Sequence, residues 1–431
     1  MDGKKGFYGW RIVSAACALQ FLISAFMMQS FGAYVAVLRE SFGWSKTALA
    51  TAAAIQQIEG ALLGPVQGWF IDRFGARNLV RAGVICFSAG MILFSQVETL
   101  LLFYVSFFII ALGTSMAGYF SLTVVIVHWF EKQRGRALSM LNLGFALGGV
   151  TVPILAWALV AFGWRATAFS SGVMALVIGW PLAGVIRNRP RDVGAVIDGD
   201  PAAEAKGSAS GDASGAASNK KAGEATSTEE TGFTVREAVR TSAFWLIALG
   251  HGFALLVVGA INVHAITFMK EGMGYSVEQA ALVIGLQTAA QVGGIALGWF
   301  VADRFEKRKI AAVCMFVHMI ALLLFTFAIA WPMVIAFALL HGCAWGLRGS
   351  FMQALRADFF GRRHFGMIMG FSSIIVVMGN VGGPLLTAIV ADATGSYRAG
   401  FTTVAMLAGF GSTFFLLLRK PQLPPRPQTQ M

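Results

Sequence analysis

The sequence predicts an all-α membrane protein in which twelve transmembrane helices form two pseudo-symmetric bundles of six. Three observations predict this fold. The composition is apolar, since 57% of the residues are hydrophobic, 13% are charged and the mean hydropathy is +0.69. Apolar runs of about twenty residues recur along the chain, and each can cross a bilayer core of about 30 Å. Short motifs of the first half return in the same order in the second half.

The apolar runs set the expected spans. The first run, 12–38, is too long for the core of a signal peptide and no small-residue cleavage site follows it, so we expect it to remain as a helix. The expected spans are 12–38, 47–71, 79–95, 99–123, 137–161, 166–186, 243–269, 279–302, 309–330, 332–355, 365–391 and 399–418.

The distribution of charge predicts the orientation. An even number of spans puts both termini on one side, and 27 of the 33 lysines and arginines fall on that side. Arg348 lies within a span, and the remaining five lie on the other side. By the positive-inside rule both termini are cytoplasmic, in a plasma membrane or the inner membrane of a bacterium. The basic excess orients the chain in lipid, and we expect no nucleic-acid partner.

A polar segment divides the chain. Residues 199–232 are rich in Ala, Gly, Ser and mixed charge and carry too little apolar surface to fold. We therefore expect an N-terminal bundle (1–190), a flexible cytoplasmic linker (191–236), a C-terminal bundle (237–420) and a cytoplasmic tail (421–431).

The two bundles carry matching motifs. The pairs are "GWFIDRFGAR" (68–77) with "GWFVADRFEKR" (298–308), "HWFEKQRGRAL" (128–138) with "DFFGRRHFGMI" (358–368), and "GWRATAF" (163–169) with "GSYRAGF" (395–401). Parallel six-helix repeats with a substrate site between them are an architecture of secondary transporters. Glycines and a proline in 143–153 and 377–385 should allow close packing and bending of those two helices.

The loop after the second span carries a family resemblance. Its signature residues are Gly68, Asp72, Arg73, Gly75 and Arg77. This pattern resembles the loop of the Major Facilitator Superfamily that latches the outward-open state, with the aspartate near the start of the eleventh helix. In the second copy Asp303 follows Gly298 by five residues instead of four, with Arg304 behind it. The resemblance therefore places the latch chiefly in the N-terminal half.

A finer resemblance comes from "GFYGWRIV" (6–13) and "RPRDVG" (189–194). Both are similar to segments of the monocarboxylate-porter and oxalate/formate-exchanger branches of that superfamily. Those branches carry a cationic residue in the eighth helix, whereas Gln287 and Gln291 occupy the best matching positions here. The two glutamines are candidate substrate contacts, and an anionic substrate would need a positive counter-charge elsewhere.

Arg348 is the candidate for that counter-charge. It shares a helical stripe with His341 and Trp345 in the tenth span. A guanidinium stays charged in a protein, and a charge at mid-membrane costs at least about 2.5 kcal/mol on insertion scales, so such groups face a cavity or a partner. We expect the stripe to bind substrate in an aqueous cavity, where a carboxylate would be held bidentately. The alternative is a structural ion pair.

Two groups are candidates for proton coupling. Glu59 lies at the centre of the second span on a polar face with Gln56 and Gln67, and a buried carboxyl there suits reversible protonation. Two other interpretations of Glu59 stay open: a resting partner of Arg348, or a protonated acid hydrogen-bonded between helices. His251, in the seventh span, is a proton site or a packing residue.

Further polar residues lie within spans. Tyr119 occupies the repeat-equivalent position of Arg348 and is expected to face the cavity from the other bundle. Asn142 and Asn380 are substrate contacts or helix-packing residues. Arg356 is expected at the cytoplasmic boundary as a loop anchor.

No pattern in the sequence indicates an enzyme. It has no nucleophile–base pair in a plausible domain, no phosphate-binding glycine loop and no metal-ligand cluster, and we expect no cofactor. The sequence predicts a monomeric secondary transporter of a small organic anion, a mono- or dicarboxylate, coupled to protons or to exchange for a counter-anion. One rival is efflux of drugs or hydrophobic metabolites, with Arg348 paired only to Glu59. Another is a non-transporting sensor that signals through the linker.

Overall fold

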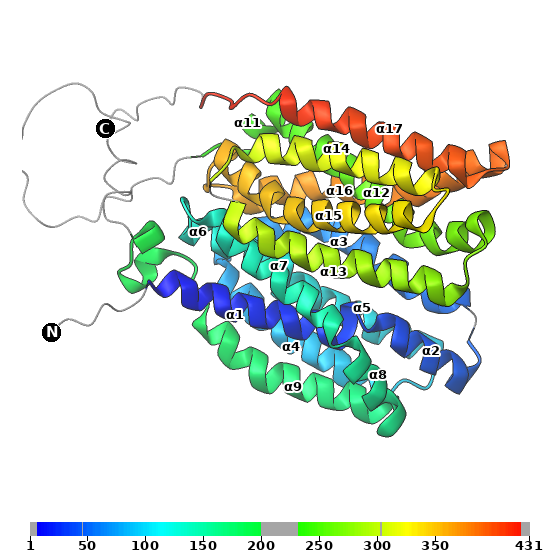
Figure 1. Ribbon diagram of the computed structural model, residues 1–431. Coiled ribbons are helices and arrows are strands. Elements are labelled where there is room, and N and C mark those ends of the chain that lie inside the picture. Colours follow the sequence, from blue (N-terminus) through cyan, green and yellow to red (C-terminus); the bar gives the residue numbers. More distant parts are fainter. Residues whose placement is uncertain (1–6, 45, 200–231, 302–303, 424–431) are drawn as a thin grey trace, which may run out of the picture.

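The computed structural model describes residues 7–44, 46–199, 232–301 and 304–423, and nearly all of them are helical (Figure 1). Within these ranges, eleven helical segments are long and apolar enough to cross a membrane. A further long helix, α3 (Lys46–Phe74), lies between the first two of them. The predicted all-helical membrane fold is therefore confirmed.

The first half of the chain builds one bundle, which runs from blue to green in Figure 1. Its first span consists of α1 (Tyr8–Ile23), a π-helical turn (Ser24–Met28) and α2 (Phe31–Phe42). The other helices are α3, α4 (Ala76–Phe94), α5 (Leu100–Ala117), α6 (Tyr119–Trp129), α7 (Arg134–Val150), α8 (Val152–Ala161) and α9 (Trp164–Val185).

The second half builds the other bundle, which runs from green to red. Its longer helices are α12 (Ser242–Met273), α13 (Val277–Val301), α14 (Lys307–Thr326), α15 (Trp331–Phe360), α16 (Phe365–Thr394) and α17 (Tyr397–Leu416). Because α1 begins and α17 ends at the same end of the molecule, on the left of Figure 1, we call this the terminus end.

Besides the first span, two further spans of the first bundle are interrupted. The fourth breaks at Gly118, whose extended backbone (φ −94°, ψ −150°) separates α5 from α6. A Cβ there would lie 2.3 Å from the carbonyl oxygen of Thr114, so glycine is required. The span predicted at 99–123 is present as Leu100–Trp129 and is divided at this residue. The fifth breaks at Thr151 because Pro153, which lacks an N–H, follows in the first turn of α8. The helix is thus interrupted within 143–153, whereas 377–385 lies inside α16, which continues past Pro384 to Thr394.

The largest buried side chains fall into two clusters, one in each bundle. Phe94 and Phe103 belong to the first, and Phe325 and Phe337 to the second. Large apolar side chains also lie on the outer surface, as expected for a protein in lipid; Val160 is 85% exposed. The first cluster also takes in Ala354, Ala357, Phe365 and Met369 of the second bundle, so the two cores meet where α15 and α16 face the first bundle.

Glycines bring the two bundles into backbone contact at the terminus end. A Cβ on Gly68 of α3 would lie 2.5 Å from the carbonyl of Gly366 on α16. One turn further along, a Cβ on Gly370 would lie 2.5 Å from the carbonyl oxygen of Gly64. Side chains at these positions would force the helices apart, so the sequence itself permits the close crossing.

The two ends of the predicted linker are folded, while its residues 200–231 lie outside the described residues. The carboxylate of Asp198 accepts hydrogen bonds from the backbone N–H groups of Glu131 (3.1 Å) and Lys132 (2.7 Å) in the α6–α7 loop. At the other end, the N–H of Phe233 donates to the carbonyl of Phe360 (2.8 Å), where α15 ends. Each end is therefore fixed to a different bundle.

The glycine crossing generates a prediction. Gly68→Ala should weaken closure of the terminus end by about 1–3 kcal/mol, because its methyl group would overlap the α16 backbone. We expect a lower thermal unfolding midpoint in detergent and slower transport in liposomes. Gly60→Ala on the same helix is the matched control, since a Cβ there meets nothing within 4 Å. Equal behaviour of the two variants would show that the helices do not touch at Gly68.

Candidate functional site

Ion pairs join the bundles at the terminus end. Arg134, at the start of α7, pairs with Asp358 of α15, and Lys307 of α14 binds the second oxygen of the same carboxylate at 2.8 Å. Arg362 pairs with Glu131 across the same boundary. The Arg134 side chain is almost fully buried, so its positive charge is stabilised by the pair with Asp358.

The aspartate of the loop signature also reaches the other bundle. The backbone N–H of Met367, in the first turn of α16, donates to Asp72 at 3.4 Å, and the His364 ring lies 4.0 Å away. The structure therefore places this aspartate at the start of the eleventh span, as the resemblance implies. A second seam is made by the Trp10 and Trp299 rings, 5.4 Å apart between centroids.

The other signature residues act within their own bundle. Gly75 has φ +80°, and the amide of Asn188 fills the space where a Cβ would stand. The same amide accepts a hydrogen bond from the Arg77 backbone N–H at 2.8 Å, while the Arg73 guanidinium lies over the Trp69 ring. In the second copy Arg304 is exposed, and Asp303 lies outside the described residues.

Arg348 lies deep in the second bundle. It stands twelve residues before α15 ends at Phe360, about 18 Å at helical rise, so its head cannot reach the terminus end. The guanidinium is enclosed, not water-facing as expected, and only 1% of the residue is exposed. Its Nε and Nη1 groups have no hydrogen-bonding partner among the described residues. The site thus holds a buried cation with unused donors.

Arg356, two turns nearer the terminus end, is a second buried cation. It is 2% exposed, and its guanidinium donates to Ser372 (2.8 Å) and Gln353 (3.0 Å) and lies 3.0 Å from the His251 ring. The expectation of a loop anchor is therefore wrong, because α15 continues to Phe360 and keeps this residue inside the bundle. All three partners are neutral or weakly basic, so the positive charge is not compensated.

The first bundle contributes Tyr119 and Asn142 opposite these arginines. Asn142 of α7 donates to the Ser350 hydroxyl of α15 at 3.1 Å, which joins the bundles at mid-height. The Tyr119 hydroxyl, at the start of α6, lies near Asn142 and within electrostatic range of Arg348 and Arg356. We call the two arginines and the polar residues around them the polar centre: Tyr119, Asn142, His251, Arg348, Ser350, Gln353, Arg356 and Ser372.

His341 pairs with a residue that the sequence reasoning missed. Its Nδ1 lies 3.1 Å from Nδ1 of His318 on α14, and both rings are fully buried. The Trp345 ring is 6.2 Å from that of His341. His318 could have been found, because an ionisable residue inside an apolar span is a functional candidate by default.

Glu59 lies apart from the polar centre. Its carboxyl group is near Ser115 of α5, which also accepts a hydrogen bond from Gln67 at 2.6 Å. Its Oε1 has no hydrogen-bonding partner in the described part of the chain, and no ion pair joins it to Arg348 there. The interpretation of Glu59 as the resting partner of Arg348 is therefore wrong in this conformation.

The remaining candidates lie at helix crossings. The backbone carbonyls of Gln287 and Gln291 face Gly342 and Gly346 where α13 crosses α15, and the Gln287 side chain is buried. The carbonyl of Asn380 faces α12 in the same way. At these positions the backbone makes the contact, and none of the three is held by a hydrogen bond to the polar centre.

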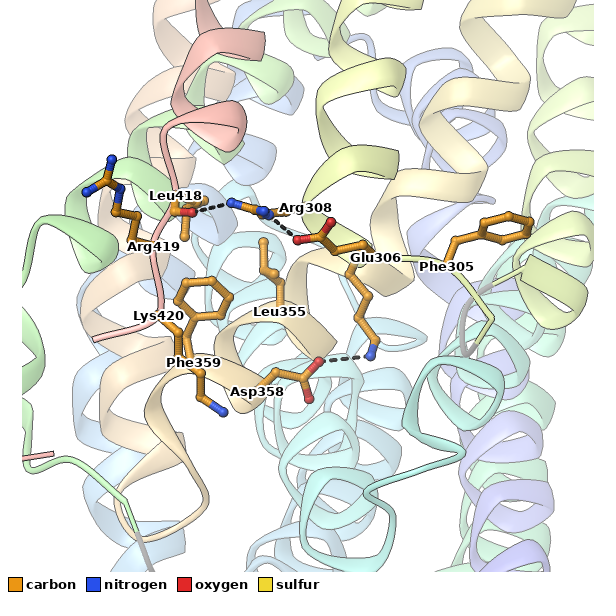
Figure 2. A pocket seen from close by; sticks show the side chains of 10 residues that line it. Phe305, Glu306, Arg308, Leu355, Asp358, Phe359, Leu418, Arg419 and Lys420 are labelled. Carbon is orange, nitrogen blue, oxygen red and sulfur yellow. Dashed lines mark hydrogen bonds and ion pairs between the residues drawn. The ribbon is translucent and has the colours of Figure 1, made fainter. Parts of the chain in front are cut away.

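A pocket of about 530 Å³ opens at the terminus end between α14, α15 and the segment after α17 (Figure 2). Asp358 and Arg308 line it, and Arg308 donates to the carbonyl of Leu418 at 2.8 Å. Hydrogen bonds from Lys309 and Arg308 hold the pKa of the Glu306 carboxyl below its usual value. The pocket lining includes Asp358, which takes part in the ion pairs, but does not include Arg348.

The described residues contain no group of three His, Cys, Asp or Glu side chains able to hold a metal.

With this geometry established, comparison with known proteins identifies the family. The sequence matches the family model of the Major Facilitator Superfamily over residues 17–301 and 247–430. The chain belongs to this superfamily. It is therefore a membrane transporter of small solutes, not an enzyme.

Proteins named as transporters are similar to this chain along most of its length. The probable hexose phosphate transport protein of Chlamydia trachomatis is 23% identical over 309 residues, which cover 71% of this chain and 67% of that protein. The hexuronate transporter of Bacillus subtilis is 24% identical over 372 residues, covering 81% and 80%. The solved human organic anion transporter MFSD10 (TETRAN) has a TM-score of 0.71 at 16% identity, covering 94% and 99%, which shows the shared fold.

The ion pairs generate a prediction. Asp358→Asn should leave buried Arg134 without its partner and weaken the closed end by about 1–3 kcal/mol, less than for a fully buried pair because Asp358 is 31% exposed. Ser139 of α7 is buried against Gly298 of α13, at the boundary between the bundles. In a cysteine-free background, the thiol of Ser139→Cys should then react with a maleimide at least about fivefold faster.

Glu131→Gln is the matched control, since this carboxylate is 56% exposed and its pair with Arg362 should contribute less than about 1 kcal/mol. Unchanged labelling in Asp358→Asn, or an equal rise in both variants, would contradict the assignment.

Proposed function

We propose that this protein is a secondary transporter that moves a small organic anion by alternating access between its two bundles. One observation carries the proposal. The polar centre holds two buried guanidinium groups, on Arg348 and Arg356, and in the described part of the chain neither is paired with a carboxylate.

The energetics favour an anionic ligand. A guanidinium at mid-membrane, such as that of Arg348, costs at least about 2.5 kcal/mol, and a second buried guanidinium, on Arg356, lies within electrostatic range of it. A carboxylate or phosphate group would neutralise the charge and accept hydrogen bonds from the free donors of Arg348. A neutralised site can close and reorient more easily than a charged one, so binding itself would lower the barrier to transport.

The relatives support an anion of this kind. Several of them are named as transporters of hexose phosphate, hexuronate or glycerol 3-phosphate, all anionic solutes. The resemblance of 6–13 and 189–194 to monocarboxylate and oxalate/formate carriers favours a mono- or dicarboxylate. Drug efflux is disfavoured, because it predicts an Arg348–Glu59 pair that the structure lacks.

We further propose that the terminus end is cytoplasmic, as the 27 of 33 basic residues on that side favour. Hydrogen bonds, ion pairs and ring contacts between the bundles lie at that end or at mid-height in the described ranges. The conformation is then closed to the cytoplasm, and substrate would approach Arg348 from outside.

A panel of labelled solutes in liposomes tests the proposal. We expect uptake of at least one of lactate, oxalate, formate, succinate, glucuronate and glucose 6-phosphate, and none of glucose. Arg348→Gln and Arg356→Gln should each reduce uptake by about 100-fold, because each leaves the buried anion without one of its positively charged partners. Arg398→Gln is the control, because that side chain is exposed at the opposite end. Undiminished uptake in Arg348→Gln would exclude its role.

A further inference from the structure

The His318–His341 pair is the polar group that the proposed function leaves unused. The two rings come from neighbouring helices, their centroids are 4.7 Å apart, and their Nδ1 atoms are 3.1 Å apart. Both residues are 0% exposed, and neither Nε2 atom has a hydrogen-bonding partner in the described part of the chain. Packing alone does not account for two unpaired imidazole nitrogens in an apolar core.

Counting the protons shows that the neutral histidine pair has one nitrogen lone pair free to accept a proton. In the neutral pair one ring donates its Nδ1–H to the Nδ1 of the other, whose own proton is on Nε2. The donating ring therefore has a bare lone pair on Nε2. One added proton there converts that ring to imidazolium and strengthens the hydrogen bond between the rings. No other bond has to break.

Arg348 is the charged group that faces the pair. It follows His341 by seven residues on α15, so both lie on one face of that helix, and it acts electrostatically on both histidines. On α14 the thiol of Cys314, one turn before His318, also interacts electrostatically with Arg348. Gln287 of α13 is uncharged, and within the described residues of α12, α13 and α17 no carboxylate acts on the pair. Tyr119 faces Arg348 from the first bundle.

We infer that His318 and His341 form the binding site of a coupling proton, which is taken up together with an anion at Arg348. A second positive charge beside an unneutralised Arg348 is repelled, whereas a bound anion removes that repulsion. By linkage the effect is reciprocal, so the proton strengthens anion binding by the same factor. The inference rests on the proposed anion transport and assigns its coupling to this pair instead of Glu59 or His251.

The first arm of the test measures anion binding to the purified protein by calorimetry. The probes are lactate, oxalate and glucuronate, whose carboxylates keep their charge between about pH 5.5 and about pH 8. The wild type should bind about tenfold more tightly at the lower pH. His318→Gln and His341→Gln should retain binding but lose this dependence. His264→Gln is the control, because that histidine is held by the Pro384 carbonyl at 3.0 Å, away from the pair.

The second arm follows protons in liposomes with an external pH-sensitive dye. Anion entry should make the medium more alkaline for the wild type and His264→Gln. The two pair variants should still exchange labelled anion for unlabelled anion without moving protons. Gel filtration checks folding; if one pair variant fails to fold, the other carries the test, since either removes the shared proton.

The outcomes separate the two proposals. Anion flux without proton movement, or proton movement unchanged in both pair variants, overturns the assignment of the pair and leaves anion transport standing. Failure to carry any anion of the panel, in either exchange or net uptake, overturns the proposed function and with it this inference.

Discussion

The arrangement of this protein depends on one electrostatic constraint: two guanidinium charges lie inside a membrane bundle without a carboxylate beside them in the described residues. Both stand on α15, an unbroken helix of 30 residues. Neutral groups fix the direction of Arg356, and the donors of Arg348 stay unused. A soluble protein would supply an acid or water at such a site. In the mechanism proposed above, a bound anion supplies the compensating charge, so the energetic cost of burying the two cations favours anion recognition.

Closure at the terminus end has two physical components. Backbone contact at Gly68 and Gly370 is short-ranged and is lost with a small separation of the helices. The ion pairs of Arg134 and Arg362 act over longer distances and become solvated as the bundles part. Most of each apolar core lies within one bundle, and only a few side chains of α15 and α16 join the first cluster, so parting the bundles would expose a small part of the cores.

Much of the fold could be predicted because each membrane helix is encoded by one continuous apolar stretch of sequence. Apolar length fixed the spans, and the internal repeat placed Tyr119 opposite Arg348. The side chains that meet between helices could not be predicted, because their contacts depend on how each helix is rotated about its own axis. Glu59 turns towards Ser115, and His318 meets His341 from a neighbouring helix. The role of Arg356 was misjudged because α15 extends past the apolar run and keeps its last turns buried.

The break at Gly118 has a consequence for the field at the centre of the bilayer. It makes Tyr119 the first residue of α6, so the amino end of a helix dipole lies beside the polar centre instead of at the membrane surface. Such a dipole carries a partial positive charge of about half a unit that no proton can remove. It therefore adds a constant attraction for oxyanions, to which any titrating side chain contributes only the variable part.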